Sequence, residues 1–271
     1  MLRGLYTAAA GMSAQMDRQQ TITNNLANVN TPGFKQDLTA LHSFPNLLLQ
    51  QMGGQDSGAS IGGLSTGVYA QENMTDFSIG TPKTTNQPTD IALVGQSLPV
   101  NPTTKQPEGA LFFTVKQPDG QIRYTRNGSF SIDGLNRLAT AEGNLVLDQK
   151  GQPITLQSND FTVESDGSIV QNGSKTATIG MAYSTNPNQQ LEKDGEGLYK
   201  SSKAVNLPMA QTTPGVSFQL KQGSLETSNV QLDQSMTDLM MAYRSFQANQ
   251  QVLKAYDSTL DLAANKVGAV E

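Results

Sequence analysis

One long amphipathic segment near the C-terminus constrains the fold of this chain more than any other feature. Between about Asn229 and Val267, positions that alternate four and three residues apart carry nine apolar residues out of eleven. These positions are Leu232, Met236, Leu239, Tyr243, Phe246, Gln250, Leu253, Asp257, Leu260, Ala264 and Val267. The pattern predicts a single α-helix, because neither Gly nor Pro occurs between Ser224 and Val267. At ~1.5 Å per residue it would reach ~58 Å, so we expect it to need a partner.

The ends of this helix have their own signals. Ser228, followed three residues later by Gln231, has the spacing of a capping box. We therefore expect the helix to begin at Ser228–Asn229 and to end at Gly268.

The first thirty residues supply a second helical stripe. Leu2, Leu5, Ala9, Met12 and Met16 keep helical spacing, and the stripe continues after a phase slip at Ile22, Leu26 and Val29. Gly4 and Gly11 weaken such a helix by ~1 kcal/mol each relative to Ala. Pro32 and Gly33, in the run Asn30-Thr31-Pro32-Gly33, predict its end. This helix is the expected partner of the C-terminal one.

The middle of the chain has the signals of β structure. Asp119-Gly120 lies between two strand-like runs and predicts a hairpin, and further turn pairs follow it. These pairs are Asp133-Gly134, Glu142-Gly143, Lys150-Gly151, Asp166-Gly167 and Asn172-Gly173. Short strands separated by such turns are typical of an antiparallel sandwich or barrel, and no helix of useful length is expected there.

We therefore predict an α+β protein whose terminal helices form a coiled-coil-like stalk with an all-β domain inserted between them. Four segments are expected: an N-terminal helix and Asn-rich turn at 1–45, a flexible Gly/Ser-rich connection at 46–66, the β domain at 67–224 and the C-terminal helix at 225–271. The two helices could pair only with each other. However, the first is too short to cover the second, and polar Gln250 and Asp257 within the stripe favour partners outside the chain.

Composition narrows the possible functions. Only 36% of residues are hydrophobic and 15% charged, and the net charge is −5. This acidic balance argues against nucleic acid as a partner, because phosphate binding needs a basic stripe. The chain has no cysteine, which excludes disulfides, thiol nucleophiles and thiolate metal sites.

Targeting signals are equally sparse. The N-terminus has no unbroken apolar core before Gln15, and no stretch approaches the ~20 apolar residues of a membrane helix. We therefore expect no membrane insertion, and any export must use a route that reads no cleavable signal.

Candidate catalytic residues form no convincing set. His42 is the single histidine, so one chain cannot hold a histidine-based triad or a multi-histidine metal site. The acids of the β region are scattered, and Asp166 and Asp194 adjoin Gly as turn formers do. These acids are Asp160, Glu164, Asp166, Glu192, Asp194 and Glu196. Residues 53–67 lack a phosphate-binding glycine pattern. We expect no catalytic residue, metal or cofactor.

Three segments, in order along the chain, resemble the flagellar rod, hook and basal-body protein family. The first is residues 24–35, NNLANVNTPGFK, with matches at Asn24, Asn25, Leu26, Ala27, Asn28, Asn30, Thr31, Gly33, Phe34 and Lys35. The second is a central β motif with matches at Tyr124, Thr125, Arg126, Gly128, Phe130, Asp133, Leu138 and Gly143. The third includes Gly223, Leu225, Glu226, Ser228, Asn229, Val230, Met236, Tyr243, Arg244, Phe246 and Asn249.

Within that family the chain is most similar to the distal-rod members and their Gram-positive relatives. The resemblance implies a structural, non-enzymatic subunit that passes unfolded through the flagellar type III export apparatus. Copies of it would assemble with other rod and hook subunits into a helical tube that transmits torque from motor to hook. The terminal helices would form the inner tube and the β domain the outer layer.

The expected assembly interface combines both helical stripes with the Asn-rich turn. Its residues are Leu5, Met12, Met16, Ile22, Asn25, Leu26, Asn28, Val29, Leu232, Met236, Leu239, Tyr243, Phe246, Gln250, Leu253, Asp257 and Leu260. Two departures from the family pattern stand out. Asn136 occupies a position that is usually Gly, although Asn tolerates the left-handed conformation, and residues 96–110 are an insertion.

Two other readings remain open at this point. One is a secreted β-rich wall hydrolase with helical docking arms, which would need clustered acids or a metal in the β domain. The other is a cap or adaptor that binds the flagellar tube without being part of it.

Overall fold

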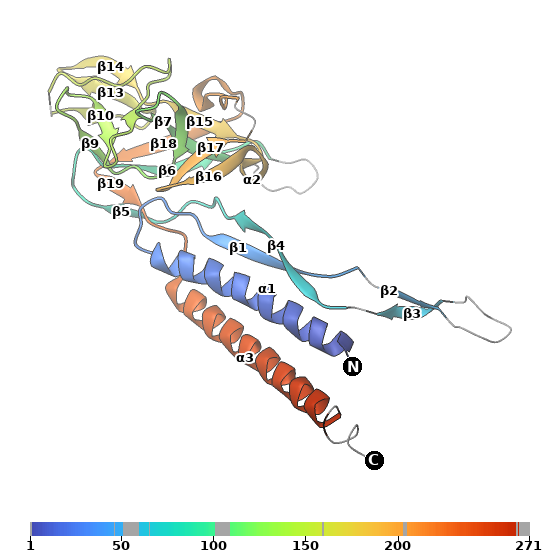
Figure 1. Cartoon of the computed structure of the whole chain (residues 1–271). Helices are drawn as coiled ribbons and strands as arrows, with labels where there is room; N and C mark the ends of the chain where they lie inside the picture. The colour runs from blue at the N-terminus through green and yellow to red at the C-terminus, as the bar shows by residue number, and fades with distance from the viewer. Residues whose placement is uncertain are drawn as a thin grey trace. The chain divides into compact units, whose positions relative to one another are not determined.

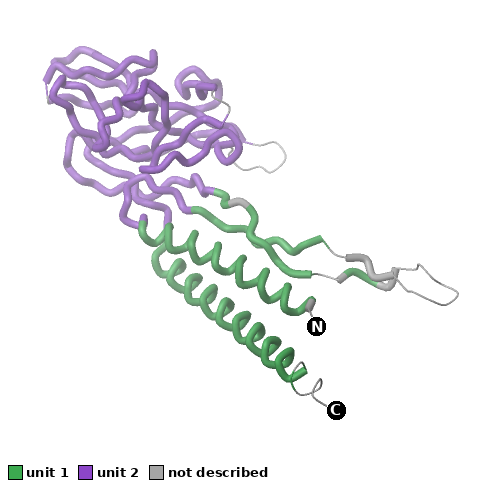
Figure 2. Tube along the Cα trace, viewed as in Figure 1, with its two compact units in different colours: residues 1–27, 37–74, 231–271 green, residues 28–36, 75–230 purple. Residues whose placement is uncertain are grey.

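The computed structural model describes residues 2–45, 47–50, 60–64, 66–100, 109–158, 160–202, 205–263 and 265. An N-terminal and a C-terminal helix pack together, and antiparallel β-sheets lie between them in the sequence (Figure 1). The predicted α+β class is therefore confirmed. The chain divides into two compact units (Figure 2), one of residues 1–27, 37–74 and 231–271 and the other of residues 28–36 and 75–230.

The first unit contains the two long helices. They are α1 (Leu2–Ala27) and α3 (Leu232–Leu262). Strand β1 (Asp37–Ser43) pairs with β4 (Val68–Thr75), and β2 (Leu47–Gln50) pairs antiparallel with β3 (Ser60–Leu64). In Figure 1, α1 lies between α3 and the β1–β4 pair, and it contacts both α3 and β1.

The helix ends differ from the sequence prediction. α3 begins at Leu232 with Gln231 as its N-cap, so the expected capping box at Ser228 is wrong. Ser228 Oγ instead accepts a hydrogen bond from the Val230 N–H, and the Asn229 side chain bonds the backbone of Gln36. These bonds hold the chain extended before the helix starts. Gly268, the expected end, lies outside the described residues.

The second unit is built from short antiparallel strands. Eight of them form one sheet in the order β16-β17-β8-β7-β11-β10-β9, with β15 also paired to β7; β12-β13-β14 form a second sheet, and β18-β6 and β19-β5 form two ribbons. The strands are β5 (Pro82–Thr84), β6 (Ile91–Ser97), β7 (Ala110–Lys116), β8 (Ile122–Thr125), β9 (Phe130–Ile132), β10 (Leu138–Thr140), β11 (Leu145–Val146), β12 (Thr162–Val163), β13 (Ser168–Gln171), β14 (Ser174–Thr178), β15 (Met181–Ser184), β16 (Leu191–Gly195), β17 (Leu198–Ser201), β18 (Ser217–Gln222) and β19 (Ser224–Glu226).

The turns agree with the sequence. The Asp119-Gly120 pair joins β7 to β8, which pair antiparallel from Lys116 with Ile122, and Gly120 has φ of +88°. Asn136 has φ of +57°, which confirms that this Asn adopts the left-handed conformation. The described residues of 67–224 include helices of only four and three residues, Pro187–Gln190 and Ala210–Thr212.

Strand β7 organises the core of this unit because both of its faces are covered. Successive side chains of a strand point to opposite faces. Leu111, Phe113 and Val115 therefore join the larger apolar cluster, whereas Ala110 and Phe112 join a smaller one. A strand buried on both faces has a continuous apolar sequence rather than an alternating one.

The expected division at 45, 66 and 224 stays a prediction. The described residues of 46–66 include β2 and β3, and residues 37–74 belong to the compact unit of the two helices. Position 46 and residues 51–59, where the flexible connection was expected, lie outside the described residues, as do residues 101–108 of the insertion. None of the helices described is both long and apolar enough to cross a membrane.

We predict that Phe113→Ala lowers the free energy of unfolding of this protein by about 3–5 kcal/mol. Phe113 is 1% exposed and packs edge-on against Phe130, with ring centroids 5.3 Å apart, so truncation leaves a cavity. Leu135→Ala is the matched control, since Leu135 is 67% exposed and its truncation should cost no more than about 0.5 kcal/mol. Urea denaturation followed by tyrosine fluorescence measures both, and equal losses would contradict the assignment of β7 to the core.

Candidate assembly interface

The face of α3 that packs against α1 is lined by residues seven positions apart. Ser235 and Ala242 are the buried residues of this helix. One and two heptads further on, Asn249 and Tyr256 lie against α1. An ion pair between Arg18 and Asp238, with nitrogen and oxygen 3.8 Å apart, joins the helices at the edge of this contact. The two helices therefore meet through one regular stripe of α3.

Two glycines of α1 make this close packing possible. A Cβ atom at Gly4 would overlap the ring and hydroxyl of Tyr256, and one at Gly11 would lie 2.8 Å from Asn249 Nδ2. The sequence alone marks these glycines as residues that weaken the helix. The structure shows that they make room for the side chains of Tyr256 and Asn249 of α3. The same two glycines that lower the helix propensity of α1 therefore allow α3 to pack closely against it.

The apolar stripe expected on α3 is therefore only half used inside the chain. One of its columns, Leu239, Phe246, Leu253 and Leu260, is half-buried. The other column, Met236, Tyr243, Gln250 and Asp257, is exposed, because the stripe that faces α1 is displaced by one residue to Ser235, Ala242, Asn249 and Tyr256. The apolar pattern predicted one face of α3, whereas the steric fit against Gly4 and Gly11 of α1 places the neighbouring face at the contact.

This displacement leaves an uncharged apolar row on the first three turns of α3, which we call the α3 ridge. Its residues are spaced four, four and three positions apart, so they lie on one side of the helix. They are Leu232, Met236, Met240 and Tyr243, with exposed fractions of 42%, 49%, 59% and 54%. Isolated exposed apolar residues are common, whereas a continuous row of four makes the α3 ridge a candidate interaction surface.

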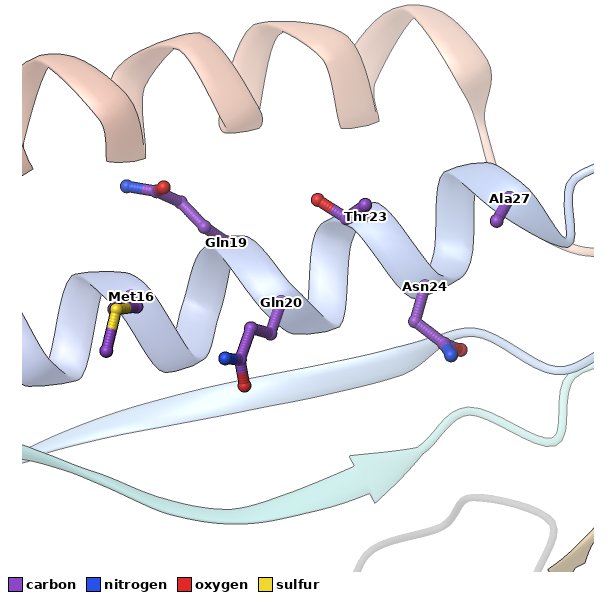
Figure 3. Close-up of a pocket in the computed structure, with 6 residues that line it drawn as sticks. All are labelled: Met16, Gln19, Gln20, Thr23, Asn24 and Ala27. Carbon is purple, nitrogen blue, oxygen red and sulfur yellow. The ribbon is translucent and has the colours of Figure 1, made fainter.

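α1 also presents an uncharged exposed surface. A shallow groove, here the α1 groove, runs along its last three turns and is lined by Met16, Gln19, Gln20, Thr23, Asn24 and Ala27 (Figure 3). Gln19 and Thr23 extend on the side of α3, whereas Gln20 and Asn24 extend on the side of the neighbouring strands. Nearer the N-terminus, Tyr6 is 67% exposed.

The remaining α1 residues of the expected interface are partly used within the chain. Leu5, Met12 and Leu26 are half-buried, as are Asn28 and Val29 of the turn that follows, and Ile22 is buried. Asn25 is 2% exposed, and its side-chain amide forms a reciprocal pair with the backbone of Asp37, with distances of 2.7 and 3.0 Å. Asn25 therefore holds β1 next to α1.

In the other unit, the three family-like motifs meet at one buried carboxylate. Lys35 Nζ donates to Glu226 Oε1 at 2.5 Å, and Arg126 Nη2 lies 3.0 Å from both oxygens of the same carboxylate. The exposed fraction of the side chain is 0% for Lys35, 1% for Arg126 and 2% for Glu226. We call these residues the ion cluster. The Gly80 N–H also donates to Glu226 Oε1, at 2.8 Å.

The Asn-rich turn is shaped to reach this cluster. The Gly33 N–H donates to the Glu226 carbonyl at 2.9 Å, and Gly33 has φ of +69°. A Cβ atom there would lie 2.5 Å from the backbone of Arg126, so a side chain is excluded both by conformation and by space. Phe34 is half-buried, with Lys193 Nζ 5.0 Å from the centre of its ring.

The other motif residues also maintain the fold. The Tyr124 hydroxyl accepts a hydrogen bond from the Leu207 N–H at 2.9 Å, and Asp133 Oδ1 accepts two from the backbone of the following turn. Gly128 has no room for a Cβ beside the Ile91 carbonyl, and Phe130 packs on Phe113. Thr31 Oγ1 bonds the Asn28 side chain at 3.2 Å, whereas Asn30 is exposed.

Burial and neighbouring charges shift the pKa values in the ion cluster. Burial, reinforced by the charge of Arg126, lowers the pKa of Lys35 to about 8, against the opposing effect of Glu226. Burial alone would raise the pKa of Glu226, but the charges of Arg126 and Lys35 outweigh it and hold that pKa below its usual value. The cluster carries two cations and one anion when fully charged.

The residues considered for catalysis lie in ordinary structural settings. His42 is exposed, 6.2 Å from the ring of Tyr69. Asp166 accepts two hydrogen bonds from Ser168 in a turn, and Asp194 forms an ion pair with Arg123 at 2.6 Å. Among the described residues, no group of three or more His, Cys, Asp or Glu side chains is placed to hold a metal ion.

Sequence reasoning missed the pairing of Lys35 and Arg126 with Glu226. One signal was available: each of the three motifs contains a charged residue, at positions 35, 126 and 226. Nothing in the spacing of positions 35, 126 and 226 shows that they meet.

Three protein-family models match the chain in the order of these motifs. A flagella basal body rod protein model matches residues 5–35. A model of the flagellar hook protein FlgE/F/G D1 domain matches residues 108–171. A model of the flagellar basal body rod FlgEFG protein C-terminal region matches residues 221–266. The matched regions contain Lys35, Arg126 and Glu226 respectively.

Relatives that align over nearly the whole chain point to the same family as the three family models. The chain is 39% identical over 274 residues to the flagellar hook-basal body complex protein FlhO of Bacillus subtilis (strain 168), with 100% of both chains covered. It is 32% identical over 280 residues to the flagellar basal-body rod protein FlgG of the same strain, covering 98% of this chain and 99% of that one. It is 27% identical to the flagellar basal-body rod protein FlgF of Escherichia coli (strain K12) over 95% of each chain.

The chain belongs to the flagellar basal-body rod FlgE/F/G family, whose members are structural rather than enzymatic proteins. It is a structural subunit of the flagellar hook–basal body, similar both to FlhO and to the FlgG rod proteins.

We predict that Gly4→Ala destabilises the packing of α1 on α3, by about 1–3 kcal/mol, because the added methyl overlaps Tyr256. In an isolated helix the same change would stabilise by about 1 kcal/mol. Thermal unfolding followed by helical circular dichroism measures the effect. The double variant Gly4→Ala with Tyr256→Ala is the control, since it removes the overlap and should recover part of the loss. Stabilisation by Gly4→Ala alone would contradict the contact.

We predict that the free energy of unfolding rises between about pH 7.5 and pH 9.5, by about 2 kcal/mol from Lys35 alone. In this window the unfolded chain still binds the Lys35 proton, whose ordinary pKa is 10.5, whereas the folded chain loses it near its pKa of about 8. Stability therefore increases with pH. Urea denaturation at several pH values measures the rise, and Lys35→Met is the control in which this increment should be missing.

Proposed function

We propose that this subunit assembles with copies of itself and with other rod and hook subunits into a helical tube that transmits torque from motor to hook. The observation that carries the proposal is the pair of uncharged exposed surfaces on the terminal helices, the α3 ridge and the α1 groove. Both belong to the same compact unit. The three motif matches place the chain in a family of rod and hook proteins.

The two surfaces suit repeated association between copies. The α3 ridge offers Met and Tyr side chains, and Met adapts its shape readily to irregular partners. The α1 groove is lined by one Met, one Ala and four amide or hydroxyl side chains, so it has no charge to desolvate. A ridge on one copy and a groove on another are different surfaces, so such contacts need not close and can generate a helical filament.

Gln250 and Asp257 are the positions we propose to set the register between copies. Both are exposed, and both continue the column of Met236 and Tyr243 towards the C-terminal end of α3. Polar residues within an apolar helix stripe favour one alignment, because a shifted alignment leaves them without partners.

We further infer that the chain passes unfolded through the flagellar type III export apparatus before it assembles. Its composition supports this route: the chain has no cysteine to form unwanted disulfides, and only 15% of its residues are charged. The β unit would then fold after export, and the exposed helix surfaces would stay uncovered until neighbouring subunits bind them.

A charge added to the α3 ridge tests the assembly proposal. We expect Met240→Glu combined with Tyr243→Glu to abolish motility and recovery of the subunit in purified basal bodies, because two carboxylates would be buried between subunits. The monomer should keep its thermal midpoint, since both side chains are more than half exposed.

Ala248→Glu combined with Ala255→Glu is the matched control, because it adds two carboxylates at other exposed positions of the same helix. These two positions are one heptad apart and lie about a third of a turn around the helix axis from the α3 ridge. The control should support motility. If the ridge variant enters basal bodies as efficiently as this control, the α3 ridge is not an assembly surface.

A further inference from the structure

The ion cluster joins the segments through which the chain enters and leaves the β unit. Residues 28–36 directly follow α1 in the sequence, and residues 226–230 lead into α3. Besides the ion pairs, the Gly33 N–H bonds the Glu226 carbonyl at 2.9 Å, and the Gln36 N–H bonds Asn229 Oδ1 at 2.8 Å. Both connecting segments are therefore held against each other inside this unit.

Holding these two segments with buried charges carries a large desolvation penalty. The cluster takes two cations and one carboxylate out of water, and buried ion pairs are often no more stable than apolar side chains of similar volume. Burial lowers the pKa of Lys35, which shows that the cation is poorly accommodated. Arg126 Nε and Ser224 Oγ are also buried without a hydrogen-bond partner among the described residues. Stability alone does not account for this choice of side chains.

The cluster provides hydrogen bonds that form only in a narrow range of directions and distances. Lys35 Nζ bonds both Glu226 and the Ser78 carbonyl, and Arg126 reaches Glu226 with Nη2 while Nη1 donates to the Leu111 carbonyl at 2.7 Å. A shift of any one segment breaks one of these bonds and leaves a buried charge without its partner. Apolar side chains of the same size would tolerate such a shift, because van der Waals packing has little directional preference.

We propose that the Lys35–Glu226–Arg126 cluster is a positioning device that selects one arrangement of residues 28–36 and 226–230 on the β unit, at no gain in stability. The consequence for assembly rests on the proposed function, because a tube requires every copy to present its two terminal helices alike. Glu226 is the central positioning residue, since both cations and the Gly80 N–H converge on it.

The absence of cysteine allows a direct test by spin labelling. Pairs of introduced cysteines are labelled at Asn30 and Glu142, at Ser228 and Glu142, and, as a control within the sheets, at Asp119 and Glu142; Asn30, Asp119 and Glu142 are exposed and Ser228 is half-buried. Electron–electron double resonance on the purified monomer then gives a distance distribution for each connecting segment. We expect one narrow distribution for each pair in the parent chain.

The deciding variant replaces the whole cluster with apolar residues: Lys35→Met, Arg126→Met and Glu226→Leu. We expect its thermal midpoint to stay within a few degrees of the parent or to rise, whereas the distributions from Asn30 and Ser228 broaden and the control pair stays narrow. Glu226→Gln, which leaves two buried cations, should instead lower the midpoint by about 10 °C or more.

A single variant separates the two segments. Lys35→Met leaves a balanced Arg126–Glu226 pair, so the distribution from Asn30 should broaden while that from Ser228 stays narrow. Unchanged distributions in the apolar variant would overturn the proposal. So would a triple variant that fails to fold or melts as early as Glu226→Gln, because the cluster would then serve stability.

These measurements need no assembled tube, so they remain valid if the α3 ridge variant proves that the subunit assembles by another surface. The cellular readout is added last: the apolar variant should fold but fail to enter basal bodies. Normal incorporation of a variant with broadened distributions would show that assembly does not depend on the selected arrangement.

Discussion

The buried carboxylate of Glu226 is the contact at which segments of the β unit that are far apart in the sequence come together. Two cations from residues 100 and 191 positions away converge on it, and the backbone N–H of Gly80 completes its hydrogen bonding. Gly33 must lack a side chain so that the first segment can approach Arg126. The charges, the glycine and the turn at this point therefore serve one geometric purpose, which is to bring three distant segments together.

In the helical unit, the packing of the two helices depends on two small residues of α1. Gly4 and Gly11 let α3 approach α1 through Tyr256 and Asn249, and Met236, Met240 and Tyr243 lie on an exposed face of the same helix. The contact within the chain thus determines which residues of α3 stay exposed, and it requires two glycines that weaken the helix propensity of α1.

Much of the architecture was predictable from local signals. The Asp119-Gly120 hairpin and the left-handed Asn136 follow from the backbone preferences of single residues, and the α+β class follows from periodicity. The start of α3 was not predictable in this way. Ser228 has the right spacing for a cap, but the Asn229 side chain bonds Gln36, a residue 193 positions away, and keeps the chain extended. A tertiary hydrogen bond overrode a local preference.

The sequence by itself determined the class, the order of elements, the turns and the family, because each depends on residues close together in the chain or on a motif. Only the tertiary structure decided which face of α3 is covered, since that depends on the steric fit of Tyr256 against Gly4. It likewise decided the partners of Lys35 and Arg126. Ion pairing requires side chains to meet in space, and no spacing along a chain reveals that the cations at positions 35 and 126 share the carboxylate at position 226.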